Sequence, residues 1–433
     1  MRMYDIIEKK RNGGELTAEE IKFFVTGATS GEIPDYQISA LLMAIFLKGM
    51  TNRETVDLTI SMRDSGDTLD LSRFGNLSVD KHSTGGVGDK TTLIVAPIVA
   101  SLGAKVAKMS GRGLGFTGGT VDKLESARGY NTSPSIDEFF EISSKCGVSV
   151  ISQTGNMAPA DKKLYALRDV TATIESIPLI TASIMSKKLA AGAKNIVLDV
   201  KCGSGAFMKT KEEATLLAAK MVEIGKMCGV NTVAVLTNMN TPLGSAIGNS
   251  LEVIEAAEIL KGKQKGALYD ICIKLASLMI SLSLDISEDE AKLRVIDSIN
   301  SGLAFSKMKE WFALQGANPN CLEDYSLFKA PKNIIEVKAE KSGYVTSIDA
   351  LSIGKAALIL GAGREKAGDS IDHSAGVYLN KTLGDYVNSG ETLCTLYTDK
   401  ETDFNIAEEI SRLAYSFSND MLKEEPLIYE TIN

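Results

Sequence analysis

The sequence predicts an α/β protein with a small all-helical domain, a large α/β domain and a C-terminal β-rich part that resembles a barrel-sandwich. Three observations support this fold class. Helix-capping signals fill the first 65 residues, strands and helices alternate from about residue 78, and short strand-like runs with glycine turns follow residue 333. The chain has 433 residues, which is enough for two or three domains.

The N-terminal helices are marked by their first turns. Thr17 and Glu20 have the spacing of a capping box, and so do Thr51 and Glu54. Pro34 suits the first turn of the helix between them. One face of that helix carries Ile38, Leu41, Leu42, Ile45 and Phe46. We expect this stripe to pack in a core or a dimer interface rather than to bind a ligand.

The middle of the chain alternates between strands and helices. We predict a buried strand over residues 195–201 and another over residues 233–238. Between them, a capping box at Thr210 and Glu213 begins a helix that runs to about Cys228. This order indicates a parallel sheet, in which ligands bind at the carboxyl ends of the strands.

The segment Ala330–Asn333 is a predicted domain boundary. Beyond it, residues 335–338 and 343–346 alternate between apolar and polar side chains. Glycine turns separate these runs, and Gly384–Gly390 has the form of a turn in a barrel-sandwich. The pattern indicates a small β-rich domain.

Charge and cysteine usage exclude several classes of protein. The chain has 47 basic and 55 acidic residues, and its formal net charge of -8 argues against general nucleic-acid binding. Six cysteines without a C-x-x-C pair argue against a zinc cluster and predict reduced, buried thiols. The N-terminus has no apolar core of a secretory signal. The most apolar run, residues 268–284, contains Asp270 and Lys274, so we expect a buried helix, no membrane span and a cytoplasmic protein.

Two glycine-rich segments carry the predicted chemistry, residues 81–92 and 108–125. Glycine lets backbone N–H groups converge on an anion, most favourably at a helix N-terminus. Charged and hydroxyl donors in the two segments are Lys81, Ser83, Thr92, Ser110 and Thr120. A tetrahedral oxyanion needs donors from several directions, so the pair of segments predicts a phosphate site. Residues 88–91 are not a P-loop, because Asp89 separates the glycine from the lysine.

The second segment resembles the signature of the thymidine and pyrimidine-nucleoside phosphorylases, S-x-R-G-x-x-x-T-G-G-T-x-D-x-x-E, from Ser110 to Glu125. The first segment is similar to the family's K-H-S-T-G-G-V-G-D loop over Lys81–Asp89. Residues 164–171, 183–188 and 199–207 match further blocks, so the similarity spans nearly the whole chain.

This resemblance implies an enzyme that uses inorganic phosphate to cleave uridine, thymidine and deoxyuridine into free base and (deoxy)ribose 1-phosphate, with no organic cofactor. It also implies a homodimer whose subunits close a helical lobe over an α/β lobe, which excludes water and brings the reactants together. The implied domains are residues 1–70 with 162–194 (helical), 71–161 with 195–330 (α/β, phosphate-binding) and 331–433 (β-rich).

The resemblance implies roles for individual residues. Phosphate contacts fall on Lys81, His82, Ser83, Thr92, Lys108, Met109, Ser110 and Thr120. Base contacts fall on Tyr165, Arg168, Ser183 and Lys187. Three of these positions are implied to be catalytic: Arg168 and Lys187 would stabilise the departing pyrimidine anion, and His82 would donate a proton to a carbonyl oxygen. His373 and Trp311 have no motif around them, so we expect structural roles for both.

The chain departs from the family pattern at two positions. Phe116 stands where the family has histidine, and its ring cannot hydrogen-bond. Relatives of broad specificity bind a monovalent cation, which implies potassium ligands at Gly88, Leu243, Ala246, Glu255 and a threonine position that is Lys90 here. The Lys90 ammonium can instead occupy the cation's place beside Glu255, which predicts an enzyme that does not need potassium.

Three alternatives remain open. A thymidine-specific phosphorylase would reject the ribose 2′-hydroxyl, although Lys108 favours the broader enzyme. An anthranilate-type phosphoribosyltransferase would need diphosphate chemistry and an acidic magnesium site. A non-enzymatic binding module would bind phosphate or nucleoside without turnover.

Overall fold

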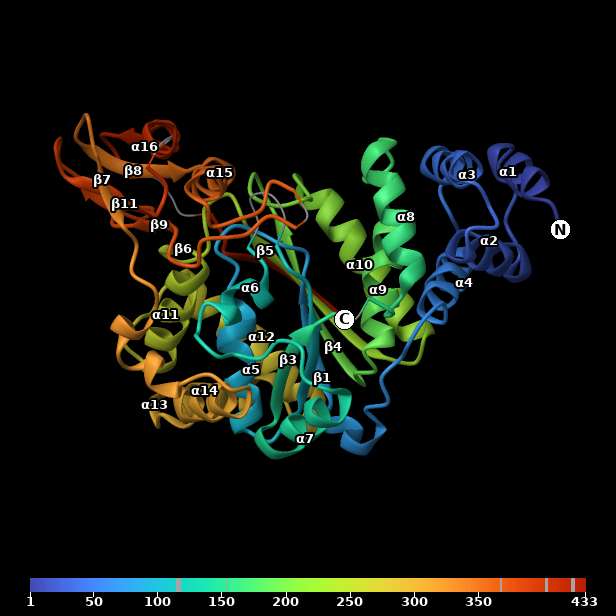
Figure 1. Cartoon of the computed structure of the whole chain (residues 1–433), viewed down its shortest axis with the longest axis horizontal. Helices are drawn as coiled ribbons and strands as arrows, with labels where there is room; N and C mark the ends of the chain where they lie inside the picture. The colour runs from blue at the N-terminus through green and yellow to red at the C-terminus, as the bar shows by residue number, and fades with distance from the viewer. Residues whose placement is uncertain (114–117, 154, 367, 402–403, 422–424) are drawn as a thin grey trace.

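The structure is a computed structural model that describes residues 1–433 except 114–117, 154, 367, 402–403 and 422–424. Phe116 therefore lies outside the described residues. The N-terminal helices lie at one end of the molecule, a parallel sheet lies in the middle, and the C-terminal sheets lie at the other end (Figure 1). The chain ends near the middle, beside the central sheet.

The helical end of the molecule combines segments from two parts of the chain. It contains α1 (Met3–Arg11), α2 (Ala18–Ser30), α3 (Asp35–Lys48), α4 (Asn52–Arg63), α8 (Pro159–Val170) and α9 (Ile177–Ala190). Side chains from α8 and α9, such as Leu164 and Leu179, share one apolar core with Phe24 and Leu41 of the N-terminal helices. This packing explains how an insertion far along the sequence joins the N-terminal helices.

The capping signals of these helices are confirmed. The Thr17 and Thr51 side chains accept hydrogen bonds from the backbone N–H groups of Glu20 and Glu54. Pro34 lies directly before α3. The stripe on α3 is buried at four of its five positions, and the fifth, Phe46, is 37% exposed in the single chain. Phe46 lies about 80° round the helix from Ile38, at the edge of the buried face.

The central sheet is parallel over the strands that the sequence predicts. Its order is β1–β4–β5–β13, with β1 (Val79–Ser83), β4 (Asn195–Cys202) and β5 (Asn231–Asn238) parallel and β13 (Ile428–Ile432) antiparallel to β5. A parallel pair, β2 (Val106–Ser110) and β3 (Val148–Ser152), joins the edge of β1 through a bridge between Ser78 and Lys105. The carboxyl ends of β1 and β2 therefore lie side by side.

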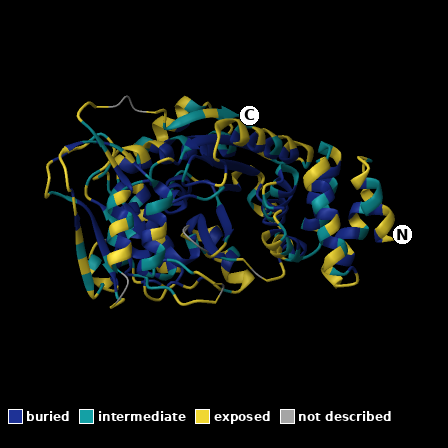
Figure 2. Cartoon of the chain, turned by 90° about the horizontal axis from the view of Figure 1, so that it is seen from above, coloured by how far each residue is buried: buried dark blue, intermediate teal, exposed yellow. Residues whose placement is uncertain are grey.

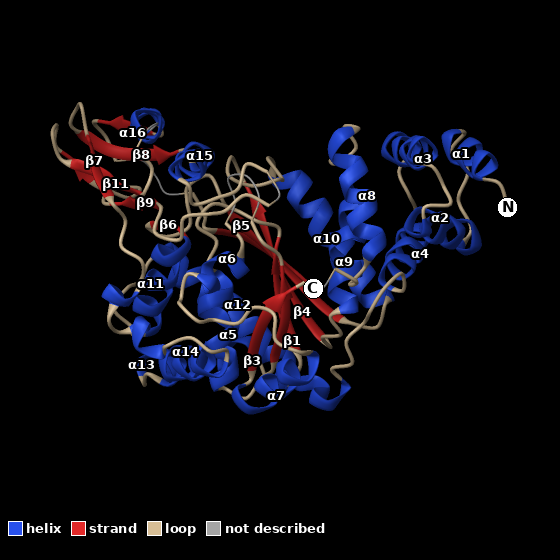
Figure 3. Cartoon of the chain, in the orientation of Figure 1, coloured by secondary structure: helices blue, strands red, loops and turns tan. Residues whose placement is uncertain are grey.

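Helices cover both faces of this sheet (Figure 3). Val197 and Val235 pack on the face with α5 (Thr91–Ser101) and α12 (Ala267–Leu284), whereas Ile196 and Leu198 pack on the face with α10 (Lys211–Met227). The helices of this part are α5 (Thr91–Ser101), α6 (Thr120–Glu125), α7 (Ile136–Cys146), α10 (Lys211–Met227), α11 (Asn249–Leu260), α12 (Ala267–Leu284), α13 (Glu288–Asn300) and α14 (Leu303–Leu314). Short 3-10 turns are η1 (Ser72–Leu77), η2 (Pro319–Leu322) and η3 (Tyr325–Leu327).

The interior positions follow the predicted burial. Figure 2 shows the sheet and the inward faces of its helices as buried and the outward faces as exposed. α12 is long and apolar enough to cross a membrane, with a mean hydropathy of 1.6, but 61% of it is buried inside the protein. The six cysteines are free thiols, and only Cys228 is not fully buried. Trp311 is completely buried against Tyr130 and Phe312, so its structural role is confirmed.

The C-terminal part is β-rich, as predicted, and also contains two helices. Its elements are β7 (Asn333–Lys338), β8 (Gly343–Ile348), α15 (Ala350–Leu360), β9 (Gly376–Leu379), β10 (Tyr386–Val387), β11 (Thr392–Thr398), α16 (Phe404–Leu413) and β12 (Tyr415–Ser418). One sheet has the order β10–β8–β12 and the other β6–β9–β11–β7. β6 (Ala246–Gly248) comes from the α/β part, so the two parts share a sheet. The exact domain limits stay a prediction.

Candidate active site

Two loops at the carboxyl ends of β1 and β2 form a common pocket. The first loop leads from Ser83 into α5, and the second leads from Ser110 to the start of α6 at Thr120. Gly85 and Gly88 have φ values of +96° and +72°, a backbone conformation that glycine adopts without strain. A Cβ on Gly119 would lie 2.1 Å from the Gly113 nitrogen, so only glycine permits that approach. The resulting cavity has a volume of about 280 Å³.

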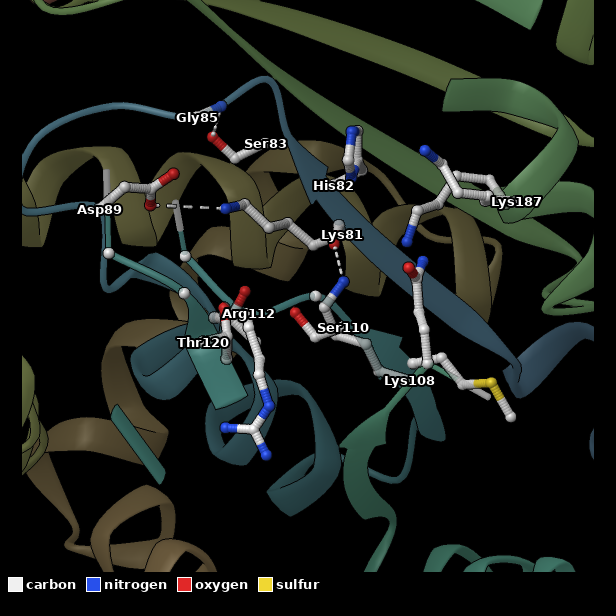
Figure 4. A pocket seen from close by; sticks show the side chains of 18 of the residues that line it. Lys81, His82, Ser83, Gly85, Asp89, Lys108, Ser110, Arg112, Thr120 and Lys187 are labelled. Atoms are coloured by element: carbon white, nitrogen blue, oxygen red, sulfur yellow. Dashed lines mark hydrogen bonds and ion pairs between the residues drawn. The ribbon is translucent and has the colours of Figure 1, made fainter. Parts of the chain in front are cut away.

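Nine of the predicted site residues line this cavity. They are Lys81, His82, Ser83, Thr92, Lys108, Met109, Ser110, Thr120 and Lys187. Lys81 lies between Ser83 and Asp89 on one side and Ser110 on the other (Figure 4). The pocket thus combines ammonium, hydroxyl and backbone groups from two loops, a set of donors that suits a tetrahedral oxyanion.

A buried ion network holds Lys81 in place. Its Nζ lies 3.7 Å from Asp89 Oδ1 and 3.6 Å from Asp199 Oδ2, and it donates to the Thr91 hydroxyl. Lys201 Nζ lies 2.7 Å from Asp199 Oδ2, and both side chains are completely buried. Burial alone would raise the pKa of Asp89, but the ammonium groups of Lys81 and Lys201 outweigh it and lower that pKa well below its usual value. Asp89 therefore stays ionised and fixes Lys81 beside the cavity.

A second network carries an excess of positive charge. Asp80 accepts from both Lys108 Nζ and Lys188 Nζ at 2.9 Å, so two ammonium groups share one carboxylate. Lys108 Nζ also donates to the Lys81 carbonyl oxygen at 2.5 Å. Burial lowers the pKa of Lys108 to about 7, because desolvation and the nearby Lys188 charge outweigh the attraction of Asp80. Since Lys108 and Lys188 both line the cavity, an incoming anion would offset the surplus charge.

His82 follows Lys81 on β1 and lines the cavity. Burial lowers the pKa of His82 well below its usual value, and the charges of Lys188 and Lys108 lower it further. The imidazole is therefore neutral at pH 7 in the free protein and can donate one N–H hydrogen bond. The role of proton donor stays a prediction, and it would require negative charge from a ligand to raise that pKa.

The predicted base contacts lie on the helical side of the molecule. Lys187 Nζ lies 2.6 Å from Asp161 Oδ2 and 3.4 Å from Ser183 Oγ. Arg168 is buried, and its guanidinium donates to the carbonyl oxygens of Thr173, Ile174 and Leu179. Tyr165 is 42% exposed, with its ring 6.0 Å from the Arg168 guanidinium carbon. Only Lys187 of this group lines the cavity.

The second loop is held by three residues of the signature, Arg112, Asp122 and Glu125, together with Arg364, which the sequence did not single out. Asp122 Oδ2 accepts from the Gly113 N–H at 2.7 Å and from Arg364 Nη1 at 2.9 Å. Arg112 donates to Glu125 Oε1 at 2.6 Å and to Asp122 Oδ1 at 3.1 Å. Arg364 lies in the C-terminal part, so this part of the chain helps to fix the phosphate loop.

Sequence reasoning also missed Asp80, Lys188 and Gln153, which surround or support the cavity. One signal was available for Asp80, because a charged residue inside a buried strand needs a partner of opposite charge. His373 does not line the cavity, and its carbonyl accepts from the Ser250 N–H and hydroxyl, which is a structural role. Among the described residues, no group of three or more His, Cys, Asp and Glu side chains is arranged to hold a metal ion.

Comparisons with known proteins identify the family. The family model described as "Glycosyl transferase family, a/b domain" matches residues 75–305, and its helical bundle domain matches residues 4–66. "Pyrimidine nucleoside phosphorylase C-terminal domain" matches residues 344–418. The pyrimidine-nucleoside phosphorylase of Geobacillus stearothermophilus is 49% identical over 434 residues, covering 100% of both chains. That of Bacillus subtilis is 52% identical over 414 residues, covering 95% of each chain.

The chain belongs to the pyrimidine-nucleoside phosphorylase family. A solved structure of anthranilate phosphoribosyltransferase from Thermus thermophilus has the same fold, with a TM-score of 0.58 and 20% sequence identity. It covers 71% of this chain and 98% of its own. At this identity the likeness concerns the fold alone. The resemblance that the glycine-rich loops predicted, and the fold class with it, are therefore confirmed.

Proposed function

We propose that this protein catalyses phosphorolysis of pyrimidine nucleosides, with uridine, thymidine and deoxyuridine as substrates and pentose 1-phosphates as products. The observation that carries the proposal is the cavity between the two glycine-rich loops, where Lys81, Lys108 and four hydroxyl side chains converge. Relatives named pyrimidine-nucleoside phosphorylase, at about half identity over nearly the whole length, support the same reaction.

The proposed phosphate is the nucleophile and binds in this cavity. Its oxygen attacks C1′ of the sugar as the bond from C1′ to the base nitrogen breaks, so positive charge develops on the sugar and negative charge on the base. The Asp80–Lys108–Lys188 cluster supports this assignment because its surplus positive charge would hold the dianion. The base then takes up one proton to leave as the neutral pyrimidine.

The proposed base site lies on α8 and α9. A guanidinium has five N–H donors, and three of those of Arg168 are used on backbone carbonyls, which leaves two for a pyrimidine carbonyl. The Lys187 ammonium has three N–H donors and two partners, Asp161 and Ser183. These remaining donors would stabilise the departing base anion. Because Arg168 and Ser183 do not line the phosphate cavity, we expect the helical lobe to close before reaction.

We also propose a homodimer in the cytoplasm, without nucleic-acid or membrane partners. Tyr36 and Leu47 lie about three turns apart on α3 and are 74% and 69% exposed. Large exposed apolar side chains on one face of a helix are a surface that a second copy would cover. Analytical ultracentrifugation tests this, and a monomer at micromolar concentration would contradict it.

Base release from uridine, thymidine and deoxyuridine, with and without phosphate, tests the proposed reaction. We expect release from all three nucleosides only when phosphate is present. Release from the two deoxynucleosides alone would make the protein thymidine-specific. Release without phosphate would make it a hydrolase, and no release in either condition would reopen the phosphoribosyltransferase and binding-module alternatives.

A further inference from the structure

Lys90 lies at the position where the family resemblance implies a potassium ligand. It directly precedes α5, at the end of the first glycine-rich loop, and its side chain is completely buried. Its Nζ donates to Glu255 Oε2 at 2.5 Å and to the Ala246 carbonyl oxygen at 2.5 Å. Two of the oxygens implied for the metal are therefore already bound to the ammonium.

A cradle of oxygens lies beside Gly88 and Lys90, and it consists of the Leu243 and Ala246 carbonyl oxygens and the Glu255 carboxylate. Glu255 Oε1 accepts from the Ser245 N–H at 2.7 Å, and Oε2 accepts from the Ala246 N–H at 3.0 Å, so the carboxylate is fixed at both oxygens. A Cβ on Gly88 would lie 2.7 Å from the Leu243 carbonyl oxygen and 3.5 Å from that of Ala246. Carbonyl oxygens from residues 243 and 246 thus lie close to Gly88, where a cation would be held.

A potassium ion does not fit this cradle as it stands. The buried charges of Lys90 and Glu255 balance, so an added monovalent cation would leave an uncompensated positive charge in the interior. An ion in contact with the Ala246 and Glu255 oxygens would also lie within a few ångström of the Lys90 ammonium, without water to screen the repulsion. A relative with threonine at this position would carry neither conflict.

We propose that the Lys90 ammonium permanently takes the place of the monovalent cation, so that this protein is folded and active without potassium. Lys90 acts as a positioning residue, since its side chain ties the end of the phosphate loop to α11 and to β6, the strand that joins the C-terminal sheet. Thr92, two residues further on, lines the phosphate cavity. The inference that the protein is active without potassium rests on the proposed phosphorolysis, whereas the inference that it is folded without potassium does not.

The test uses the wild type, Lys90→Thr and a matched control, Lys10→Thr. Lys10 forms a comparable buried ion pair with Glu54, at 2.7 Å and with side chains 4% and 0% exposed, far from the cradle. Thermal unfolding is measured in potassium chloride and in choline chloride at the same ionic strength. Phosphorolysis of uridine is then measured in both salts.

The proposal predicts a different response for each protein. The wild type unfolds at the same temperature in both salts. K90T unfolds at a lower temperature in choline and recovers by about 3 °C, saturably, as potassium fills the vacated cradle. K10T is destabilised equally in both salts, because its lost ammonium leaves no oxygen cradle. The KM of K90T for phosphate falls towards the wild-type value when potassium is added.

Two results would overturn the proposal: saturable stabilisation of the wild type by potassium, or a K90T variant that does not respond to potassium. If K90T does not fold in either salt, the wild-type comparison decides alone. Potassium-responsive stability of K90T without any phosphorolysis by the wild type would support the cation replacement while contradicting the proposed function.

Discussion

Lys108 links the charge of the cavity to pH in a way that can be measured. Its pKa of about 7 means that the ammonium form dominates at pH 6 and is a minor form at pH 8. An oxyanion in the cavity favours the ammonium form, so binding above pH 7 must be coupled to uptake of a proton. Sulfate is the better probe, because it remains a dianion throughout this range whereas phosphate titrates.

The expected size of the effect follows from that pKa. About 9% of Lys108 is protonated at pH 8, so sulfate affinity should fall about tenfold between pH 6 and pH 8 and about ninetyfold by pH 9, or about 1.4 and 2.7 kcal/mol. Burial and the neighbouring ammonium groups lower the pKa of His82 well below 6.5, so His82 is neutral across this window in the free protein. Sulfate affinity falls as pH rises, because the Lys108 ammonium loses its charge as pH passes its pKa in the folded protein.

Isothermal titration calorimetry checks this directly. Measurements at pH 8 in buffers of different ionisation enthalpy should reveal uptake of about one proton per sulfate. Lys108→Arg keeps the positive charge at every pH and should flatten the profile, and Lys108→Met should bind weakly without pH dependence. A wild-type affinity that is constant from pH 6 to pH 9, or an equal fall in K108M, would show that Lys108 does not couple sulfate binding to pH.

Three further predictions concern residues that hold the site. Arg364→Ala should raise the KM for phosphate about tenfold with the nucleoside KM unchanged, because Arg364 fixes the loop through Asp122, and an unchanged phosphate KM would contradict this. Its control is Arg2→Ala in an exposed pair. Asp199→Asn should lower the free energy of unfolding by about 3 kcal/mol in denaturant titrations, because it leaves Lys201 buried without its carboxylate. Glu141→Gln, in an exposed pair, is the control and should not change the free energy of unfolding measurably. Lys187→Met should lower kcat/KM for uridine about a hundredfold while sulfate still binds. Lys163→Met, in an exposed pair on α8, is the control and should leave kcat/KM unchanged. An equal loss of kcat/KM in both variants would remove Lys187 from the base site.

Local signals in the sequence predicted much of the fold. The capping boxes at Thr17, Thr51 and Thr210 and the strands after residue 195 depend on neighbouring residues, and each is present. Contacts between distant segments could not be predicted in this way. β13 leaves the C-terminal part to pair with β5, and β6 leaves the α/β part to pair with β9, because strand pairing depends on tertiary position.

The candidate site shows the same division between local signals, which the sequence reveals, and contacts between distant segments, which it does not. The glycine spacing and the donors of the two loops identified Lys81, Ser83, Ser110 and Thr120, which all line the cavity. The residues that were missed act through distant partners. The place of Asp80 in a buried strand indicates that it needs a partner, but only the structure shows that the partners are Lys108 and Lys188, and Arg364 lies 242 positions from Asp122. The assignments of individual residues to base and phosphate stay predictions.

Phosphorus NMR of a single reaction shows whether the protein catalyses phosphorolysis. Wild-type protein is incubated with uridine and inorganic phosphate, and the phosphorus signals are followed while free uracil is measured by absorbance. We expect inorganic phosphate to be consumed and one sugar phosphate to appear for each uracil released. Uracil released without loss of inorganic phosphate, or no uracil at all, would contradict it.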